Sequence, residues 1–158
     1  MRYPLEIFEA VRHVWPSEKP LGMRISASDW DDAGWTIDDS VIFARELKKR
    51  GCDFVDCSSG GNSPNRPPVG PGFPGYQLPF SEQVRNESDI PTIAVGMLRD
   101  YHLAEEAISN GKADLIALGR GMLYDSRWAW HAAHELGGKA SYPNQYARSE
   151  PEKWPKAF

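Results

Sequence analysis

Hydrophobic and polar positions follow two different spacings along the chain. Segments with apolar residues every three or four positions predict helices, and short apolar runs bounded by turn residues predict strands. The expected elements are helices over 5–15, 37–50, 80–85, 101–110 and 121–136, and strands over 21–26, 54–58, 91–96 and 113–118. A leading helix followed by four strand–helix units predicts an α/β fold with a parallel sheet covered by helices.

The ends of the second helix and the long loop after the second strand have distinct compositions. Either Thr36 or Asp38 is expected to cap this helix, which should end before Gly51 after a run of basic residues. Glycine and proline dominate residues 59–79, and long irregular segments of this kind are usually functional or mobile.

The four strand–helix units fit either a doubly wound sheet or half of a barrel. A complete (β/α)8 barrel needs eight such units and typically about 250 residues.

Composition excludes several classes of protein. The chain has 158 residues, of which 41% are hydrophobic and 25% charged, as in an ordinary soluble domain. A net charge of −4 without a basic cluster argues against a nucleic-acid partner. No apolar run approaches the roughly 20 residues that span a bilayer, and no signal peptide is evident. Cys52 and Cys57 are too few for a disulfide framework or a zinc site, so we expect reduced thiols, no metal and a cytoplasmic location.

Arg24 is the first candidate for chemistry, because it lies inside an otherwise apolar strand. An arginine in a closed core is costly unless it is paired. In a barrel the carboxyl ends of the strands face the active site, so Arg24 predicts an anionic or electron-rich ligand. The alternative is a structural ion pair with Asp29, Asp31 or Asp56.

Glycine-containing segments follow three of the predicted strands. Residues 58–61 (Ser-Ser-Gly-Gly) would let the backbone approach a ligand closely, although alone they also fit a plain loop. Residues 95–97 (Val-Gly-Met) and 118–120 (Leu-Gly-Arg) end the third and fourth strands. TIM barrels commonly bind phosphate after their last two strands, and Arg120 would add a bidentate donor. These segments therefore predict a phosphate site.

Three other sequence features are weaker indications of a functional site. Residues 70–75 match G-x-G-x-x-G formally, but their prolines remove backbone donors and no helix begins there, so a Rossmann site is rejected. His131 and His134 lack the H-E-x-x-H spacing and are expected on an exposed helix face. Cys57 is expected to be a small buried side chain and not a nucleophile.

Five segments along the chain together match the pattern of one known family. They are Met23–Asp29, Asp56–Gly61, Ile93–Met97, Ala113–Arg120 and Pro143–Arg148. They resemble the C-terminal half of an old yellow enzyme, and most closely its YqjM-like and xenobiotic-reductase-like branch. The resemblance covers nearly the whole chain in the right order. It implies the C-terminal half of a TIM (β/α)8 barrel over residues 1–138 and a C-terminal arm over 139–158 at a subunit interface.

The resemblance implies an FMN cofactor, with NADPH or NADH as reductant, and an activated alkene such as an α,β-unsaturated carbonyl compound as substrate. Arg24 is implied to contact the flavin N1/O2 edge and stabilise negative charge there. Arg148 is implied to reach the active site of a neighbouring subunit, as expected of a homo-oligomer. The residues implied to bind the cofactor are Arg24, Ser59, Gly60, Val95, Gly96, Met97, Gly119 and Arg120.

The resemblance also implies that part of the enzyme lies outside this sequence. The family's substrate-binding His pair, its redox-tuning Cys or Thr and its protonating Tyr belong to the N-terminal half, and Met1 matches an internal position. We therefore expect a truncation, a mis-assigned start, a designed half or one piece of a split enzyme. Four strands cannot close a barrel, so the chain should pair with the missing N-terminal half-barrel or with a second copy of itself.

Two other functions remain open. The chain is alternatively a binding or assembly module that holds FMN or phosphate without catalysis of its own. A different phosphate-binding barrel enzyme would share the glycine segments, but it explains Arg24 less well.

Overall fold

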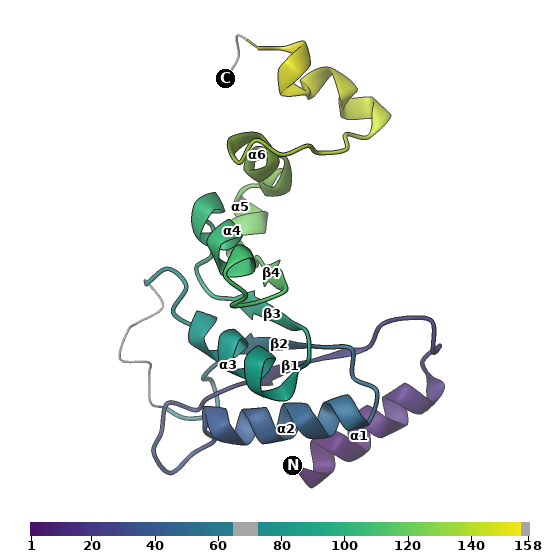
Figure 1. Ribbon diagram of the computed structural model, residues 1–158, viewed down its shortest axis with the longest axis vertical. Coiled ribbons are helices and arrows are strands. Elements are labelled where there is room, and N and C mark those ends of the chain that lie inside the picture. The colour runs from purple at the N-terminus through teal and green to yellow at the C-terminus, as the bar shows by residue number, and fades with distance from the viewer. Residues whose placement is uncertain (65–72, 156–158) are drawn as a thin grey trace. The chain divides into compact units, whose positions relative to one another are not determined.

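The computed structural model describes residues 1–64 and 73–155, which form two compact units, Met1–Leu118 and Gly119–Phe158. Residues 70–72, half of the segment 70–75, lie outside the described part. The expected division at residue 138 stays a prediction. The elements of the first unit, shown in Figure 1, are helices α1 (Arg2–Val14), α2 (Ile37–Lys49), α3 (Leu78–Ser88) and α4 (Tyr101–Ser109), and strands β1 (Gly22–Ser26), β2 (Phe54–Ser58), β3 (Thr92–Val95) and β4 (Leu115–Ala117).

The four strands form one parallel sheet in the order β1-β2-β3-β4. Each pair of neighbouring strands is joined through a helix, as parallel pairing requires. The expected alternation of strands and helices is therefore confirmed, and every predicted strand overlaps an observed one. Because all strands run the same way, their carboxyl ends meet at one edge of the sheet.

The two faces of the sheet differ sharply. Side chains that point to one face, among them Ile25, Val55 and Cys57, are buried in a core with residues of α1, α2 and α3. The strand register places Arg24, Asp56, Ile93 and Leu115 in one row on the opposite face. Leu115 is 57% exposed, so this opposite face is at least partly open to solvent. Below it is called the open face.

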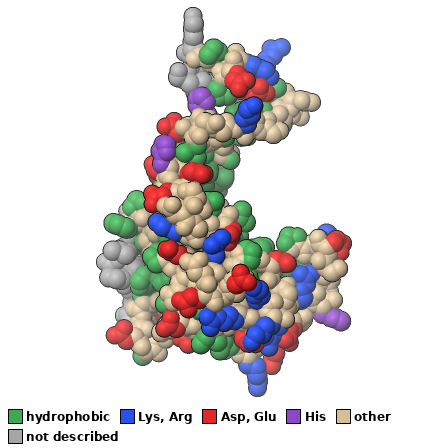
Figure 2. Space-filling model, in the orientation of Figure 1, with side chains coloured by type: hydrophobic (Ala, Val, Ile, Leu, Met, Phe, Trp, Pro, Cys, Tyr) green, Lys and Arg blue, Asp and Glu red, His purple; other side chains and the backbone are tan. Residues whose placement is uncertain are grey.

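Ion pairs join α2 to its neighbours on the outside of the first unit. Lys48 Nζ lies 2.6 Å from a carboxylate oxygen of Asp89, which follows α3, and Arg50 Nε lies 2.6 Å from a carboxylate oxygen of Glu9 in α1. Figure 2 shows acidic and basic side chains interspersed on the surface that these helices present. Such exposed pairs contribute little stability, so the buried core supplies most of it.

Thr36, and not Asp38, caps α2. Its hydroxyl accepts a hydrogen bond from the Asp39 N–H at 3.3 Å, and the Asp39 carboxylate accepts one from the Thr36 N–H at 3.0 Å. This reciprocal pair is a capping box. Asp38 instead accepts a hydrogen bond from Gln83 of α3. The helix ends as expected, with Gly51 at a φ of +80° that suits glycine.

The prediction of one helix over residues 121–136 is wrong. The second unit has two short helices here, α5 (Arg120–Tyr124) and α6 (Trp128–Glu135), followed by the 3₁₀ helices η1 (Asn144–Ser149) and η2 (Pro151–Lys153). Asp125 interrupts the helix with an extended backbone, because its carboxylate accepts a hydrogen bond from the Arg127 N–H at 3.0 Å. Aspartate side chains often compete with helix formation in this way.

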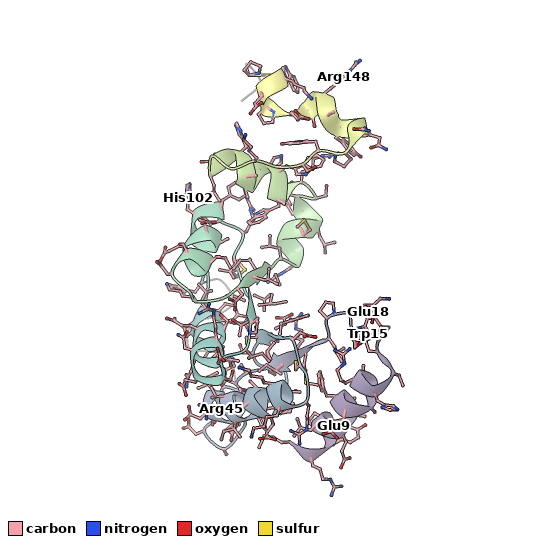
Figure 3. The ribbon with its side chains drawn as sticks, turned by 45° about the vertical axis from the view of Figure 1, so that its right-hand side comes forward. Glu9, Trp15, Glu18, Arg45, His102 and Arg148 are labelled. Carbon is pink, nitrogen blue, oxygen red and sulfur yellow. The ribbon has the colours of Figure 1, made fainter. Side chains whose placement is uncertain are left out.

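Stacked side chains hold η1 against α6. The Arg127 guanidinium lies 4.9 Å from the ring centroid of Trp130 and 4.3 Å from that of Tyr146. Trp130 also packs against Tyr142, with 4.6 Å between ring centroids. Cation–π and aromatic contacts of this kind stabilise by roughly 0.5–1.5 kcal/mol each. Figure 3 shows Arg148 projecting from η1.

Replacing Thr36 by Ala removes the capping box and is expected to lower the free energy of unfolding by about 1 kcal/mol. Urea denaturation followed by circular dichroism measures the change. Ser17→Ala, in the exposed turn after α1, is the control and should shift the free energy by less than about 0.5 kcal/mol. Equal effects of the two substitutions would contradict the role of the cap.

Candidate functional site

Arg24 lies at the centre of β1 and faces the open side of the sheet, where its side chain is 64% exposed. Its Nε donates a hydrogen bond to the Ser58 hydroxyl at 3.3 Å, and its Nη1 lies 3.9 Å from Asp56 Oδ2. The expected alternative of an ion pair is thus present with Asp56, but at a distance too long for a hydrogen bond. Among the described residues, Nη2 of Arg24 has no hydrogen-bond partner, so this guanidinium can still bind an electron-rich group.

Asp56 is the more buried member of this pair, with its side chain only 17% exposed. Its Oδ1 is buried and accepts no hydrogen bond from any residue that the structure describes. Burial raises the pKa of the Asp56 carboxyl, and the positive charge of Arg24 opposes that rise. A buried carboxylate oxygen without a donor is costly and is expected mainly where it has a function.

One buried amide links the carboxyl ends of β2 and β3. Gln77, at the start of α3, is 4% exposed. Its Oε1 accepts a hydrogen bond from the Ser59 hydroxyl at 2.6 Å, and its Nε2 donates one to the Val95 carbonyl at 2.9 Å. The Ser59 oxygen also accepts a hydrogen bond from the indole N–H of Trp30 at 3.1 Å. Sequence analysis missed Gln77 and Trp30, since no spacing or motif distinguishes them from other loop residues.

The backbone after β2 turns through two glycines. Gly60 and Gly61 have φ values of +74° and +94°, which glycine adopts without strain. The Gly60 carbonyl accepts a hydrogen bond from the Ser26 hydroxyl and its N–H donates one to the Ser28 carbonyl, both at 2.8 Å. The turn is therefore fixed to β1, while a side chain added at Gly61 would meet no atom of the described residues within 4 Å. None of these residues blocks the approach of a ligand to the backbone at Gly61.

The turn after β3 is tighter. Gly96 has a φ of +118°, and a Cβ at this position would lie 2.6 Å from Gln77 Nε2. Met97 follows with a φ of +55°, a conformation that costs a non-glycine residue about 1 kcal/mol or more. Strain of this kind is most common at functional sites. The Met97 side chain is 41% exposed, so packing in a core does not account for the strain.

The remaining predicted site residues belong to the second unit. Gly119 and Arg120 follow β4 after Leu118, and Arg120 is the first residue of α5. A side chain at Gly119 would meet no described atom within 4 Å. Arg148 is exposed on η1. The first unit thus brings together Arg24, Ser59, Gly60, Val95, Gly96 and Met97, and the roles of all these residues stay predictions.

The burial of Cys57 and the exposure of His131 agree with the expectation from the sequence. Cys57 is fully buried, and burial raises the pKa of its thiol to about 12. His131 is half-exposed on α6 and its Nδ1 lies 2.8 Å from an Asp125 carboxylate oxygen.

In residues 1–64 and 73–155, no group of three or more His, Cys, Asp or Glu side chains could hold a metal ion. Within the same ranges, none of the helices has the length and apolar character needed to cross a membrane.

Comparison with known proteins identifies the class. Residues 1–138 match the NADH:flavin oxidoreductase / NADH oxidase family, and the chain belongs to this family. It is 47% identical over 143 residues to an NADPH dehydrogenase of Geobacillus thermodenitrificans, covering 90% of this chain and 41% of that protein. It is 44% identical over 147 residues to an NADPH dehydrogenase of Bacillus subtilis, covering 93% of this chain and 42% of that protein. The chain therefore spans about two fifths of the length of these relatives.

A solved structure supports the fold. A 2-naphthoyl-CoA reductase in complex with 2-naphthoyl-CoA superposes with a TM-score of 0.70 at 19% identity, covering 87% of this chain and 21% of that one. The expected α/β architecture, four βα units of a TIM barrel, is confirmed. The expected family is confirmed as well, and with it FMN as the family's cofactor.

Replacing Gly96 by Ala is expected to lower the free energy of unfolding by about 1–3 kcal/mol, because the new Cβ meets Gln77 and the positive φ becomes strained. Gly119→Ala is the matched control, since that glycine has a φ of −84° and open space around it. Thermal or urea unfolding compares the two variants. If Gly96→Ala is no more destabilising than Gly119→Ala, the tight turn after β3 is not as described.

Proposed function

We propose that this chain forms the FMN-binding part of an NADPH- or NADH-dependent oxidoreductase that reduces activated alkenes such as α,β-unsaturated carbonyl compounds. The observation that carries the proposal is the position of Arg24, an exposed guanidinium on the same sheet whose glycine turns follow β2 and β3. Family membership and the NADPH dehydrogenase relatives support the oxidoreductase class. The alkene substrate rests on the resemblance to old yellow enzymes.

The residues suit the chemistry of FMN. The isoalloxazine ring has an electron-rich pyrimidine edge, and the partly unpaired guanidinium of Arg24 fits that edge. Ser59 and the side-chain-free backbone of Gly61 suit the close approach of a flat ring, and Gly60 lies next to the Trp30 indole. The phosphate is assigned to the backbone at Gly96 and Met97 after β3, and to Gly119 and Arg120 after β4, where barrels commonly bind phosphate.

Arg24 is the residue of this chain that would act on the reaction itself. Bound FMN supplies the ability to accept hydride from a nicotinamide and to pass it on. The Arg24 guanidinium would hold the N1/O2 edge of the ring and would stabilise negative charge there on reduction. Because the site is fixed by the Ser58, Ser59 and Gln77 hydrogen bonds, little reorganisation is needed when that charge appears.

Groups that bind and protonate the alkene are assigned to protein outside this chain. By the resemblance, the His pair and the acidic Tyr belong to the N-terminal half-barrel. We propose that this half, or a second copy of the chain, covers the open face. Arg148, exposed on η1, is proposed to contribute to the active site of a neighbouring subunit in a homo-oligomer. The cytoplasm is the proposed location.

A binding or assembly module is the second candidate function. The open face favours it, because Leu115 lies exposed at the end of the row that contains Arg24 and Asp56. A four-stranded parallel sheet also leaves β1 and β4 as edge strands. Both features suit a partner that covers the open face and pairs with an edge strand.

FMN binding tests the proposed cofactor site. The purified chain is incubated with FMN and desalted, and the visible absorption band of the retained flavin is measured before and after addition of NADPH. Arg120→Ala is expected to weaken FMN binding about ten- to a hundredfold, because it removes a charge-assisted hydrogen bond to the phosphate. Arg2→Ala, which removes a highly exposed arginine of α1, should bind FMN as the wild type does. Equal binding by both variants would contradict the assignment of Arg120.

Light scattering coupled to size-exclusion chromatography tests the covering of the open face. The chain is expected to elute as a dimer, or as a complex with an added N-terminal half-barrel. Leu115→Arg should weaken that association, because it places a charge on the open face, whereas Leu123→Arg on α5 is the control at another exposed leucine. A monodisperse monomer that binds no added half-barrel would contradict the proposal.

A further inference from the structure

We propose that Asp56 is a positioning residue for Arg24, whose orientation and effective charge toward the flavin it sets. This inference rests on the proposed function, and it goes beyond it by assigning a role to a carboxylate that is not expected to touch the cofactor.

The strand register brings the two side chains together. Arg24 and Asp56 are Cα partners in the parallel pair β1–β2, so their side chains point to the same face of the sheet. Asp56 Oδ2 lies 3.9 Å from Arg24 Nη1, and the Ser58 hydroxyl accepts a hydrogen bond from Nε. The Ser58 hydroxyl is itself fixed by donating to the Ile25 carbonyl at 2.8 Å. Ser58 thus holds the guanidinium at Nε, the Asp56 charge lies beside Nη1 without a hydrogen bond, and Nη2 is left for the ligand.

Stability alone does not account for Asp56. A carboxylate that stabilises a fold normally accepts several hydrogen bonds, but within the described residues Oδ1 accepts none. A pair at 3.9 Å, in which Arg24 is 64% exposed, gains little Coulomb energy against the cost of burying the carboxylate. The cost of burying this carboxylate without a donor to Oδ1 indicates a function that requires its charge.

The charge of Asp56 reduces the positive field that Arg24 presents to a bound ring. A guanidinium without its counter-charge would favour the anionic reduced flavin more strongly over the neutral oxidised flavin. Asp56 would therefore keep the reduced state from becoming too stable to pass hydride on. Removing its charge while keeping its shape tests this directly.

The first test measures the midpoint potential of FMN bound to the full chain, with the N-terminal half-barrel added if it is required for binding. Asp56→Asn is expected to favour the reduced flavin about tenfold, which corresponds to a potential about 30 mV more positive for a two-electron couple. Asp32→Asn, at an exposed position in the loop before α2, is the control for loss of one negative charge and should leave the potential unchanged. An unchanged or more negative potential for Asp56→Asn would overturn the inference.

Coupling to Arg24 separates positioning from a merely structural role. In an Arg24→Gln background, Asp56→Asn should no longer shift the potential, because the residue through which it acts is gone. A shift of the same size in both backgrounds would show that Asp56 acts independently of Arg24 and would also overturn the inference.

A measurement without flavin distinguishes failure of this inference from failure of the proposed function. Nuclear magnetic resonance of the Asp56 side-chain carboxyl follows its titration in the wild type and in Arg24→Gln. The pKa should be higher in the variant, because Arg24 no longer stabilises the ionised form. No difference between the two proteins would overturn the pairing whatever the flavin does, whereas a chain that shows the pairing but binds no FMN would overturn the proposed function and, with it, the role toward the flavin.

Discussion

Parallel, in-register pairing of the four strands is the constraint on which the rest of the structure depends. It places every strand's carboxyl end at one edge of the sheet, so that turns distant in the sequence, at Gly60 after β2 and Gly96 after β3, become neighbours. The same register puts Arg24 beside Asp56 on the open face. A slip of one residue in β1 would turn Arg24 toward the apolar core, and the same slip in β2 would turn Asp56 there, where neither charge could be accommodated.

Gln77 turns this alignment into a defined site. One amide connects the Ser59 hydroxyl to the Val95 carbonyl, so the ends of β2 and β3 are fixed relative to each other by two hydrogen bonds to the same side chain. The close approach of Gln77 also explains why residue 96 is glycine, since any Cβ there would collide with the amide. The part of the site proposed for the flavin ring and the part proposed for the phosphate are thus mechanically linked, which fits a ligand with two ends at a constant distance.

Much of the fold could be predicted from the sequence, because strands buried on one face leave short apolar runs between glycines. The strand over 54–58 was predicted to the residue, and Thr36 was one of the two expected caps. The break between α5 and α6 was not predicted, since it depends on a side-chain hydrogen bond at Asp125 that competes with an otherwise helical pattern. Gln77 was missed for a related reason: its function lies in contacts across the sheet, which leave no local signal. Arg24 was found as an outlier in an apolar strand, but the register that pairs it with Asp56 needed the structure.

The central claim is that FMN binds along the carboxyl edge of this sheet, and mapping backbone amide signals by nuclear magnetic resonance during FMN addition tests it most directly. The account predicts the largest shifts at Gly60, Gly61, Gly96, Met97, Gly119 and Arg120, with signals of the outer α2 surface, such as Arg45 and Lys48, unchanged. Shifts confined to the outer helical surface, or the absence of shifts at the turns after β2 and β3 while FMN is bound, would contradict it.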